Sequence, residues 1–142
     1  MRLSCGVAHA VAACALILAP VSSVQAHHST AEFNYAATVI IKGRIKELQW
    51  TNPHSYVQVL VPQKDGSLQQ WSVEIGAPAI NVNMGWRKTS VKPGDEVTLN
   101  IAPARDGRRF GTLRTLTFAD GRVLNGVAAR VKSDKEGFGI VK

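Results

Sequence analysis

The sequence predicts a mainly β fold, a small OB-like antiparallel β barrel of five to six strands with one short helix. Apolar and polar residues alternate along several short segments that are rich in β-branched side chains. Turn residues separate these segments, and helix signals lie between the third and the fourth. Three strands, a short helix and two or three further strands are the chain order of an OB-like barrel, although a small open sandwich is the alternative.

The first half of the domain is predicted to be a three-stranded meander. Residues 38–50 form a long first strand, in which Gly43 indicates a bulge or a sharp bend because a residue without a side chain lets a strand coil strongly. A second strand is expected at residues 56–61 and a third at residues 68–75. Residues 64–67, Lys-Asp-Gly-Ser, are typical of the hairpin turn that joins these two strands.

A short helix and the remaining strands follow. Within residues 77–86, Pro78 suits a first helical turn and Gly85 suits a C-terminal cap. Residues 92–95, Lys-Pro-Gly-Asp, indicate another turn. Three more strands, separated by Asp-Gly turns, are expected at residues 97–101, 113–118 and 123–124.

The first 26 residues have the parts of a secretory signal peptide. Arg2 opens a short positive region, residues 7–20 are almost wholly apolar, and Val24-Gln25-Ala26 offers small residues where a signal peptidase reads. We therefore expect a periplasmic or secreted protein. No later segment reaches the roughly 20 apolar residues that span a bilayer, so we expect no transmembrane segment in the mature chain. The alternative is lipoprotein processing at Cys14, although the apolar run continues beyond it.

These boundaries predict how the chain is organised. Cys5 and Cys14 both lie in the signal, so the mature protein would contain neither a disulfide nor a cysteine metal site. Phe33 and Tyr35 are available to hold an N-terminal arm in place. The expected parts are a signal peptide at 1–26, an extended arm at 27–36, an OB-like β domain at 37–129 and a polar C-terminal tail at 130–142.

The formal net charge of +7 at pH 7 makes the protein basic. In a cytoplasmic protein this charge would indicate nucleic acid, but secretion removes most such partners, and we expect no nucleic acid. An unknown small ligand or an anionic envelope component fits better. Net charge also keeps proteins soluble, with no partner involved.

Cleavage after Ala26 would place His27 and His28 beside a free α-amine. A terminal histidine can bind copper(II) through its amine and its own ring, and a second histidine from elsewhere completes a nitrogen-rich set. His28 offers another route, through the amine, the intervening amide nitrogen and its ring. His54, which follows Thr-Asn-Pro, is the candidate that would close the site from the domain. Copper is the one cofactor that the sequence suggests; the alternative is solvated histidines without a metal.

A second group of candidates would serve an organic ligand or an anionic envelope polymer. Aromatic side chains on the strands of a small barrel can stack on sugars or bases, and arginines can bind phosphate or carboxylate. The same residue types can instead serve core contacts and a solvated hairpin. The candidates are Trp50, Asn52, Tyr56, Trp71, Arg105, Arg108 and Arg109.

Signals of covalent catalysis are few. The chain has no Gly-x-Ser-x-Gly elbow and no phosphate-binding glycine loop. Glu32, Glu47 and Glu74 are scattered along the sequence. We expect a non-catalytic binding protein. A copper-dependent oxidase is a further alternative, but so small a domain offers little platform for a substrate.

Several motifs of the mature chain form a shared pattern. They are His27-His28-Ser29 with Phe33, Gly43, Trp50-Thr51-Asn52-Pro53-His54, Trp71, Gly85-Trp86, residues 92–97 and residues 103–107. This pattern resembles the DUF6152 family, small secreted bacterial proteins of unknown function. The resemblance implies a small periplasmic β domain and supplies no activity, but it links the two histidine-bearing segments as parts of one pattern.

Overall fold

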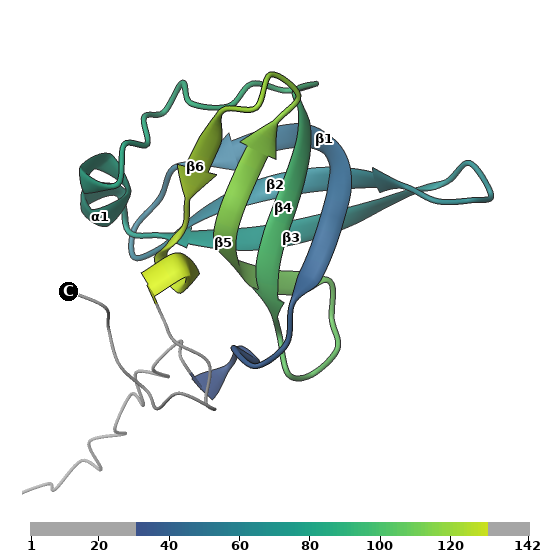
Figure 1. The fold of residues 1–142 in the computed structure, drawn as a ribbon, viewed down its shortest axis with the longest axis horizontal. Helices are drawn as coiled ribbons and strands as arrows, with labels where there is room; N and C mark the ends of the chain where they lie inside the picture. Colours follow the sequence, from purple (N-terminus) through teal and green to yellow (C-terminus); the bar gives the residue numbers. More distant parts are fainter. Residues whose placement is uncertain (1–30, 131–142) are drawn as a thin grey trace, which may run out of the picture.

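A computed structural model describes residues 31–130. The chain forms a closed five-stranded β barrel with one additional strand and a short helix, which confirms the predicted OB-like fold. Figure 1 shows how the strands wrap around the barrel, with the helix at one end. The elements are β1 (Val39–Gln49), β2 (Ser55–Pro62), β3 (Leu68–Gly76), α1 (Pro78–Asn83), β4 (Glu96–Pro103), β5 (Phe110–Phe118), β6 (Val123–Asn125) and a 3-10 helix, η2 (Val127–Arg130). Among these residues no helix is long and apolar enough to cross a membrane.

The barrel closes because β3 and β5 pair directly. The strands follow the order β3-β2-β1-β4-β5-β6, and all neighbours in this order are antiparallel. The additional β3–β5 pairing is parallel and comprises three residue pairs, from Ser72↔Phe110 to Glu74↔Thr112. Closure removes most exposed strand edges, which matters in a small domain.

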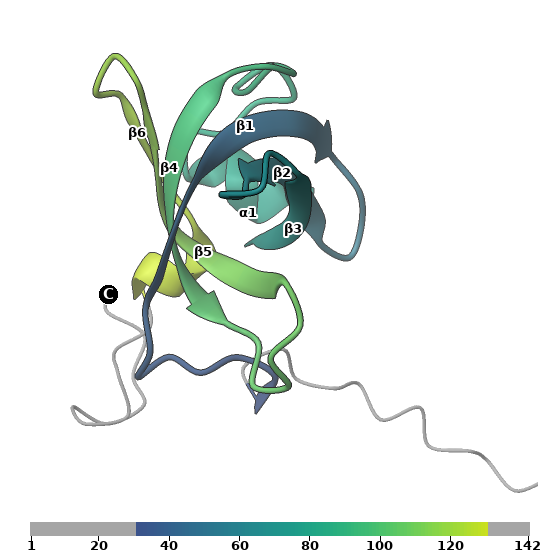
Figure 2. The same ribbon diagram turned by 90° about the vertical axis from the view of Figure 1, so that its right-hand side faces the viewer.

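Strand β1 curves strongly, as Figure 2 shows, and this curvature lets it pair with two neighbouring strands. Its first half pairs with β4 and its second half with β2; Arg44 pairs with both. A Cβ atom at Gly43 would lie 2.4 Å from the carbonyl oxygen of Leu60, so the close approach of β1 and β2 requires glycine. The register irregularity itself falls later, between Ile45 and Glu47.

The barrel interior is filled by alternate residues of the strands. Val57, Val59 and Val73 are wholly buried, and so is Trp86, which follows α1. The indole Nε1 of Trp86 donates a hydrogen bond to the carbonyl oxygen of Asn125 at 2.7 Å, which attaches the segment after α1 to the end of β6. Residues that point outward on the same strands are therefore free to build sites on the barrel surface.

A second, smaller apolar cluster lies outside the barrel. Phe33 forms an isolated bridge with Ala104, and Phe33 and Tyr35 are both buried. The cluster comprises Phe33, Tyr35, Ala102 and Ala128, with Phe110 against it. Figure 2 shows the segment that leads into β1 running beside the loop between β4 and β5. The N-terminal segment therefore covers part of the outer surface of β4 and β5.

Candidate functional site

His54 and Glu74 form a polar pair on the outside of the barrel. Nδ1 of His54 lies 3.2 Å from Oε2 of Glu74. The His54 side chain is 34% exposed, whereas that of Glu74 is 6% exposed, so the carboxylate is buried and the imidazole reaches solvent. With Nδ1 facing the carboxylate, the Nε2 atom of His54 is the ring nitrogen available to a ligand.

The β2–β3 pairing positions these two side chains. Tyr56 pairs with Glu74, and the next residues inward, Val57 and Val73, pair with each other and point into the core. Side chains alternate along a strand, so Tyr56 and Glu74 point outward. His54 directly precedes β2, and the hydroxyl of Thr51 donates a hydrogen bond to its carbonyl oxygen at 2.8 Å. This short loop holds His54 beside the outward face of β3.

Burial dominates the electrostatics of Glu74. It raises the pKa of the Glu74 carboxyl above its ordinary value, and the nearby His54 opposes part of that rise. The pKa values of Tyr35 and Tyr56 are also raised, first by their own burial and then by the charge of Glu74. The Glu74 carboxylate thus affects the ionisation of two phenols and contacts one imidazole.

A chain of ring contacts leads from the N-terminal segment to this pair. The ring centroids of Phe33 and Phe110 lie 5.3 Å apart, and those of Phe110 and Tyr56 lie 6.2 Å apart. Tyr56 in turn follows His54 by two residues and pairs with Glu74. Phe33 is therefore two ring contacts from the strand residue that pairs with Glu74.

The predicted metal ligands divide between described and undescribed parts of the chain. His54 is described; His27 and His28 lie outside the described residues. Within residues 31–130, no three His, Cys, Asp or Glu side chains lie close enough together to hold a metal ion. His54, with its contact to Glu74, is the part of the predicted metal site that lies among the described residues.

The predicted aromatic candidates do not form one exposed face. Trp50 and Trp71 are partly buried and pack against the barrel core. Asn52 is exposed in the β1–β2 loop and has a cis peptide bond to Pro53. Tyr56 packs on Phe110 next to the His54–Glu74 pair. Tyr56 is the aromatic candidate that pairs with Glu74 across β2 and β3.

The predicted basic candidates lie together on the β4–β5 loop and are exposed. Arg108 forms ion pairs with Asp106 and with Glu32 of the N-terminal segment, and its guanidinium lies 4.7 Å from the centre of the Phe110 ring. Arg109 donates to Oε1 of Gln69 at 3.0 Å. The backbone N–H of Arg105 donates to the carbonyl oxygen of Glu32. This loop therefore attaches the N-terminal segment to the barrel.

Amide side chains lie farther along the same face of β2 and β3. Gln58, which is 5% exposed, donates to Oε1 of Gln49 and to Oγ of Ser72. Gln70 donates to Gln58 and accepts from Lys46. This part of the surface is therefore polar, and its amide groups are hydrogen-bonded to one another and to their neighbours.

Sequence reasoning missed Glu74. It stands in Val73-Glu74-Ile75, where both neighbours are wholly buried core residues. A carboxylate inside an apolar strand segment is the signal that could have been used, because acidic residues are rarely buried without a partner. The distance along the sequence does not indicate that His54 is the partner of Glu74, because the pairing of β2 with β3 brings these two residues together.

Comparison with known proteins identifies a family and nothing further. The family described as "Family of unknown function (DUF6152)" matches residues 15–114. No curated protein and no solved structure gives a significant match to the chain. A family match over more than half of the sequence shows that this chain belongs to the DUF6152 family.

Proposed function

We propose that the protein is a non-catalytic periplasmic binding protein that binds copper(II) through His27, His28 and His54. The observation that carries this proposal is the contact of the His54 imidazole with the buried Glu74 carboxylate. A histidine that binds a metal through one ring nitrogen usually donates a hydrogen bond from the other to a carboxylate or a carbonyl. This hydrogen bond fixes the tautomer and the orientation of the ring. His54 has this arrangement, with its other nitrogen free for a metal.

The chain length before Phe33 supports a site shared with the amino terminus. His28 precedes Phe33 by five residues, a stretch that can span at most about 18 Å. Phe33 contacts Phe110, and Phe110 contacts Tyr56, which lies two residues after His54. These contacts support the proposal, because the chain between Phe33 and the terminal histidines is long enough to bring them toward His54.

The ligand chemistry favours copper. A free α-amine and imidazole nitrogens form a nitrogen-rich set, and copper(II) binds such sets more tightly than other divalent first-row ions. The amine must lose its proton, and its reference pKa is about 7.7–8.0, so affinity rises with pH through neutrality. Both routes, through His27 or through His28, require cleavage after Ala26.

Electron paramagnetic resonance with copper(II) tests the proposal. The cleaved protein that begins at His27 is titrated beside a form whose α-amine is acetylated and beside His54→Ala. Both changes should weaken binding by tenfold or more and change the nitrogen hyperfine pattern, each by removing one ligand. Gln63→Ala, on the β2–β3 hairpin, is the matched control and should leave the spectrum unchanged.

The behaviour of His54→Ala decides whether the amino terminus and the domain share one copper site. If His54→Ala binds copper with the affinity and spectrum of the parent protein, the amino terminus binds metal without the domain. The alternative is an organic ligand or an anionic envelope polymer, and it stays a prediction. Its candidate residues are Trp50, Asn52, Tyr56, Trp71, Arg105, Arg108 and Arg109. Binding of a glycan that Trp50→Ala abolishes, without any response to copper, would favour that alternative.

A further inference from the structure

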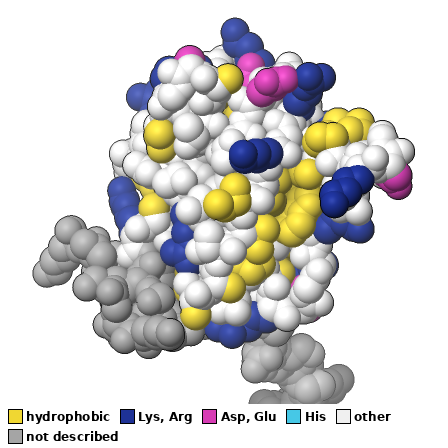
Figure 3. All heavy atoms as spheres, turned by 45° about the vertical axis from the view of Figure 1, so that its right-hand side comes forward, with side chains coloured by type: hydrophobic (Ala, Val, Ile, Leu, Met, Phe, Trp, Pro, Cys, Tyr) yellow, Lys and Arg dark blue, Asp and Glu magenta, His cyan; other side chains and the backbone are white. Residues whose placement is uncertain are grey.

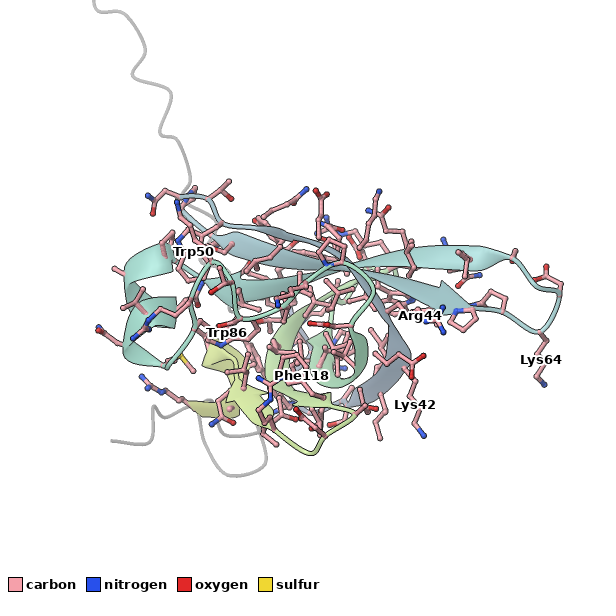
Figure 4. The ribbon with its side chains drawn as sticks, turned by 90° about the horizontal axis from the view of Figure 1, so that it is seen from above. Lys42, Arg44, Trp50, Lys64, Trp86 and Phe118 are labelled. Atoms are coloured by element: carbon pink, nitrogen blue, oxygen red, sulfur yellow. The ribbon has the colours of Figure 1, made fainter. Side chains whose placement is uncertain are left out.

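A groove of about 780 Å³ opens at the end of the barrel beneath the β2–β3 hairpin. Figure 3 shows hydrophobic side chains gathered in this region, with Lys and Arg side chains around them. In Figure 4, Lys42 and Arg44 lie on the hairpin side of the barrel, and Trp50 and Trp86 lie at the α1 end. The volume is within the range of small-molecule sites, roughly 300–1,000 Å³.

The curvature of β1 and the length of the hairpin create the groove. The β1–β2 pairing ends at Leu60, whereas β2 and β3 continue to pair as far as Pro62 and Leu68. The hairpin therefore extends past the barrel, and its end overhangs the point where β1 turns from β2 to β4. Gly43 lies at this turn and lines the groove.

The walls of the groove are mostly apolar. Ile45, Val97 and Phe118 are buried and line it from three different strands. Pro62 is exposed, and Leu68 is 60% exposed on the hairpin side. Exposed apolar side chains beside a concave apolar surface are typical of ligand-binding grooves.

The charge at the groove is positive. Arg44 and Glu96 both line it, and they form an ion pair at 2.8 Å. Lys42 also lines the groove and is exposed, and no hydrogen bond or ion pair joins it to another side chain of residues 31–130. Since the Arg44–Glu96 pair is neutral overall, Lys42 leaves one positive charge beside an apolar channel.

We infer that this groove binds a free, single-chain aliphatic carboxylate. The chain would lie against Ile45, Val97 and Phe118, and the carboxylate would meet the ammonium group of Lys42. An apolar surface with one cation at its edge matches a molecule that has an apolar chain and one anionic end. The groove shares no residue with the proposed copper site, so either proposal can fail without the other.

Titration calorimetry with decanoate, kept below the concentration at which it forms micelles, tests the inference. Affinity should rise about two- to fourfold with each methylene added from octanoate to decanoate, as burial of a hydrocarbon chain requires. Decanol, which has the same chain without the charge, should bind more weakly. Equal binding of decanol and decanoate would overturn the role of Lys42.

Two variants locate the site, each with a matched control. Leu68→Ser and Lys42→Gln should each weaken decanoate binding about two- to fivefold, the range expected when exposed contacts are removed. Ile40→Ser removes a side chain that is 64% exposed on β1 outside the groove, and Lys88→Gln removes an exposed charge that is also outside it. Neither control should change the affinity for decanoate. Equal losses in variants and controls would overturn the assignment.

Two other occupants are distinguished in the same experiments. Vesicles of neutral phospholipid with an anionic lipid are sedimented with the protein, and its oligomeric state is measured by ultracentrifugation. Binding to vesicles without binding of monomeric decanoate would overturn the inference in favour of a membrane. A dimer that Leu68→Ser dissociates, again without decanoate binding, would overturn it in favour of a second copy of this chain.

Discussion

The ring centroid of Phe33 lies 5.3 Å from that of Phe110, which joins the N-terminal segment to the first residue of β5. Phe33 is 1% exposed, so its ring is fully buried in this contact. The same Phe110 ring contacts Tyr56. The entry of the chain into the barrel and the surroundings of the His54–Glu74 pair therefore depend on one aromatic cluster.

Replacement of this anchor should affect stability and metal binding together. Phe33→Ala should lower the free energy of unfolding by about 3–5 kcal/mol, because it removes a fully buried ring. It should also weaken copper binding although it removes no ligand. Urea denaturation and copper titration measure the two effects, with Phe33→Leu as the milder control. A destabilised Phe33→Ala protein that retains full copper affinity would show that the anchor does not position the amino terminus.

The buried carboxyl of Glu74 should make stability depend on pH. Its pKa in the folded protein is raised above 4.5, so the folded state keeps a proton that the unfolded chain has released. The free energy of unfolding should therefore fall as the pH rises from about 4.5 through the raised value. Glu74→Gln should lack this fall, so its stability relative to the parent protein should increase with pH. Urea denaturation at a series of pH values measures the difference.

His54 supplies a control for this dependence. The charge of His54 lowers the pKa of Glu74 and so opposes the effect of burial. His54→Ala should therefore extend the fall in stability to higher pH. A constant difference between Glu74→Gln and the parent protein across the range would contradict the assignment to this carboxyl.

Gly43 should tolerate no side chain. A Cβ atom there would lie 2.4 Å from the carbonyl oxygen of Leu60 and 2.9 Å from Cγ1 of Val59, so β1 and β2 would have to separate. Gly43→Ala should destabilise the protein by about 2 kcal/mol or more, in the range of overpacking. Gly66→Ala is the control, since nothing lies within 4 Å and the cost is that of a left-handed backbone, about 1 kcal/mol. Similar losses in thermal denaturation would argue against the close approach.

Trp86 should be sensitive to a conservative change. Trp86→Phe removes the indole donor of the hydrogen bond to Asn125 and leaves space in the core, so we expect a loss of about 2–3 kcal/mol in the free energy of unfolding. Trp50→Phe, at a partly buried position, should cost less than about 1.5 kcal/mol. Guanidinium denaturation of the two variants makes the comparison, and an equal cost would contradict the role of the buried donor.

The strands and turns were predictable because their signals are local. Alternation fixes which residues of β2 and β3 face the core, and Gly66, Gly107 and Gly121 have the positive φ angles that the predicted turns need. Pro78 begins the helix, as predicted, and Gly85, the predicted C-terminal cap, follows the last helical residues with a φ of 92°. The backbone N–H groups of Gly85 and Trp86 donate to the carbonyl oxygens of Val82 and Asn81, the pattern in which a glycine of positive φ ends a helix.

The two sites were less accessible to sequence reasoning because both depend on non-local geometry. The His54–Glu74 contact requires the β2–β3 register, including its irregularity between Ser55 and Tyr56. The groove requires residues of β1, the hairpin, β4 and β5 to converge where β1 curves. The sequence predicts the bend at Gly43, but whether a groove forms beside that bend depends on the positions of the surrounding strands. His54 was a candidate through its residue type and its place after Thr-Asn-Pro, and neither of these indicates Glu74 as its partner.

Barrel closure through β3 and β5 has a mechanical consequence. That pairing is three residues long, shorter than the β1–β2, β2–β3 or β4–β5 pairings, and its last pair joins Glu74 to Thr112. Short pairings open most readily in local unfolding. Any opening of this pairing would move the Glu74 carboxylate that contacts His54. A ligand bound at His54 would therefore stabilise the closed barrel, and amide hydrogen exchange along β3 would be slower when the ligand is bound.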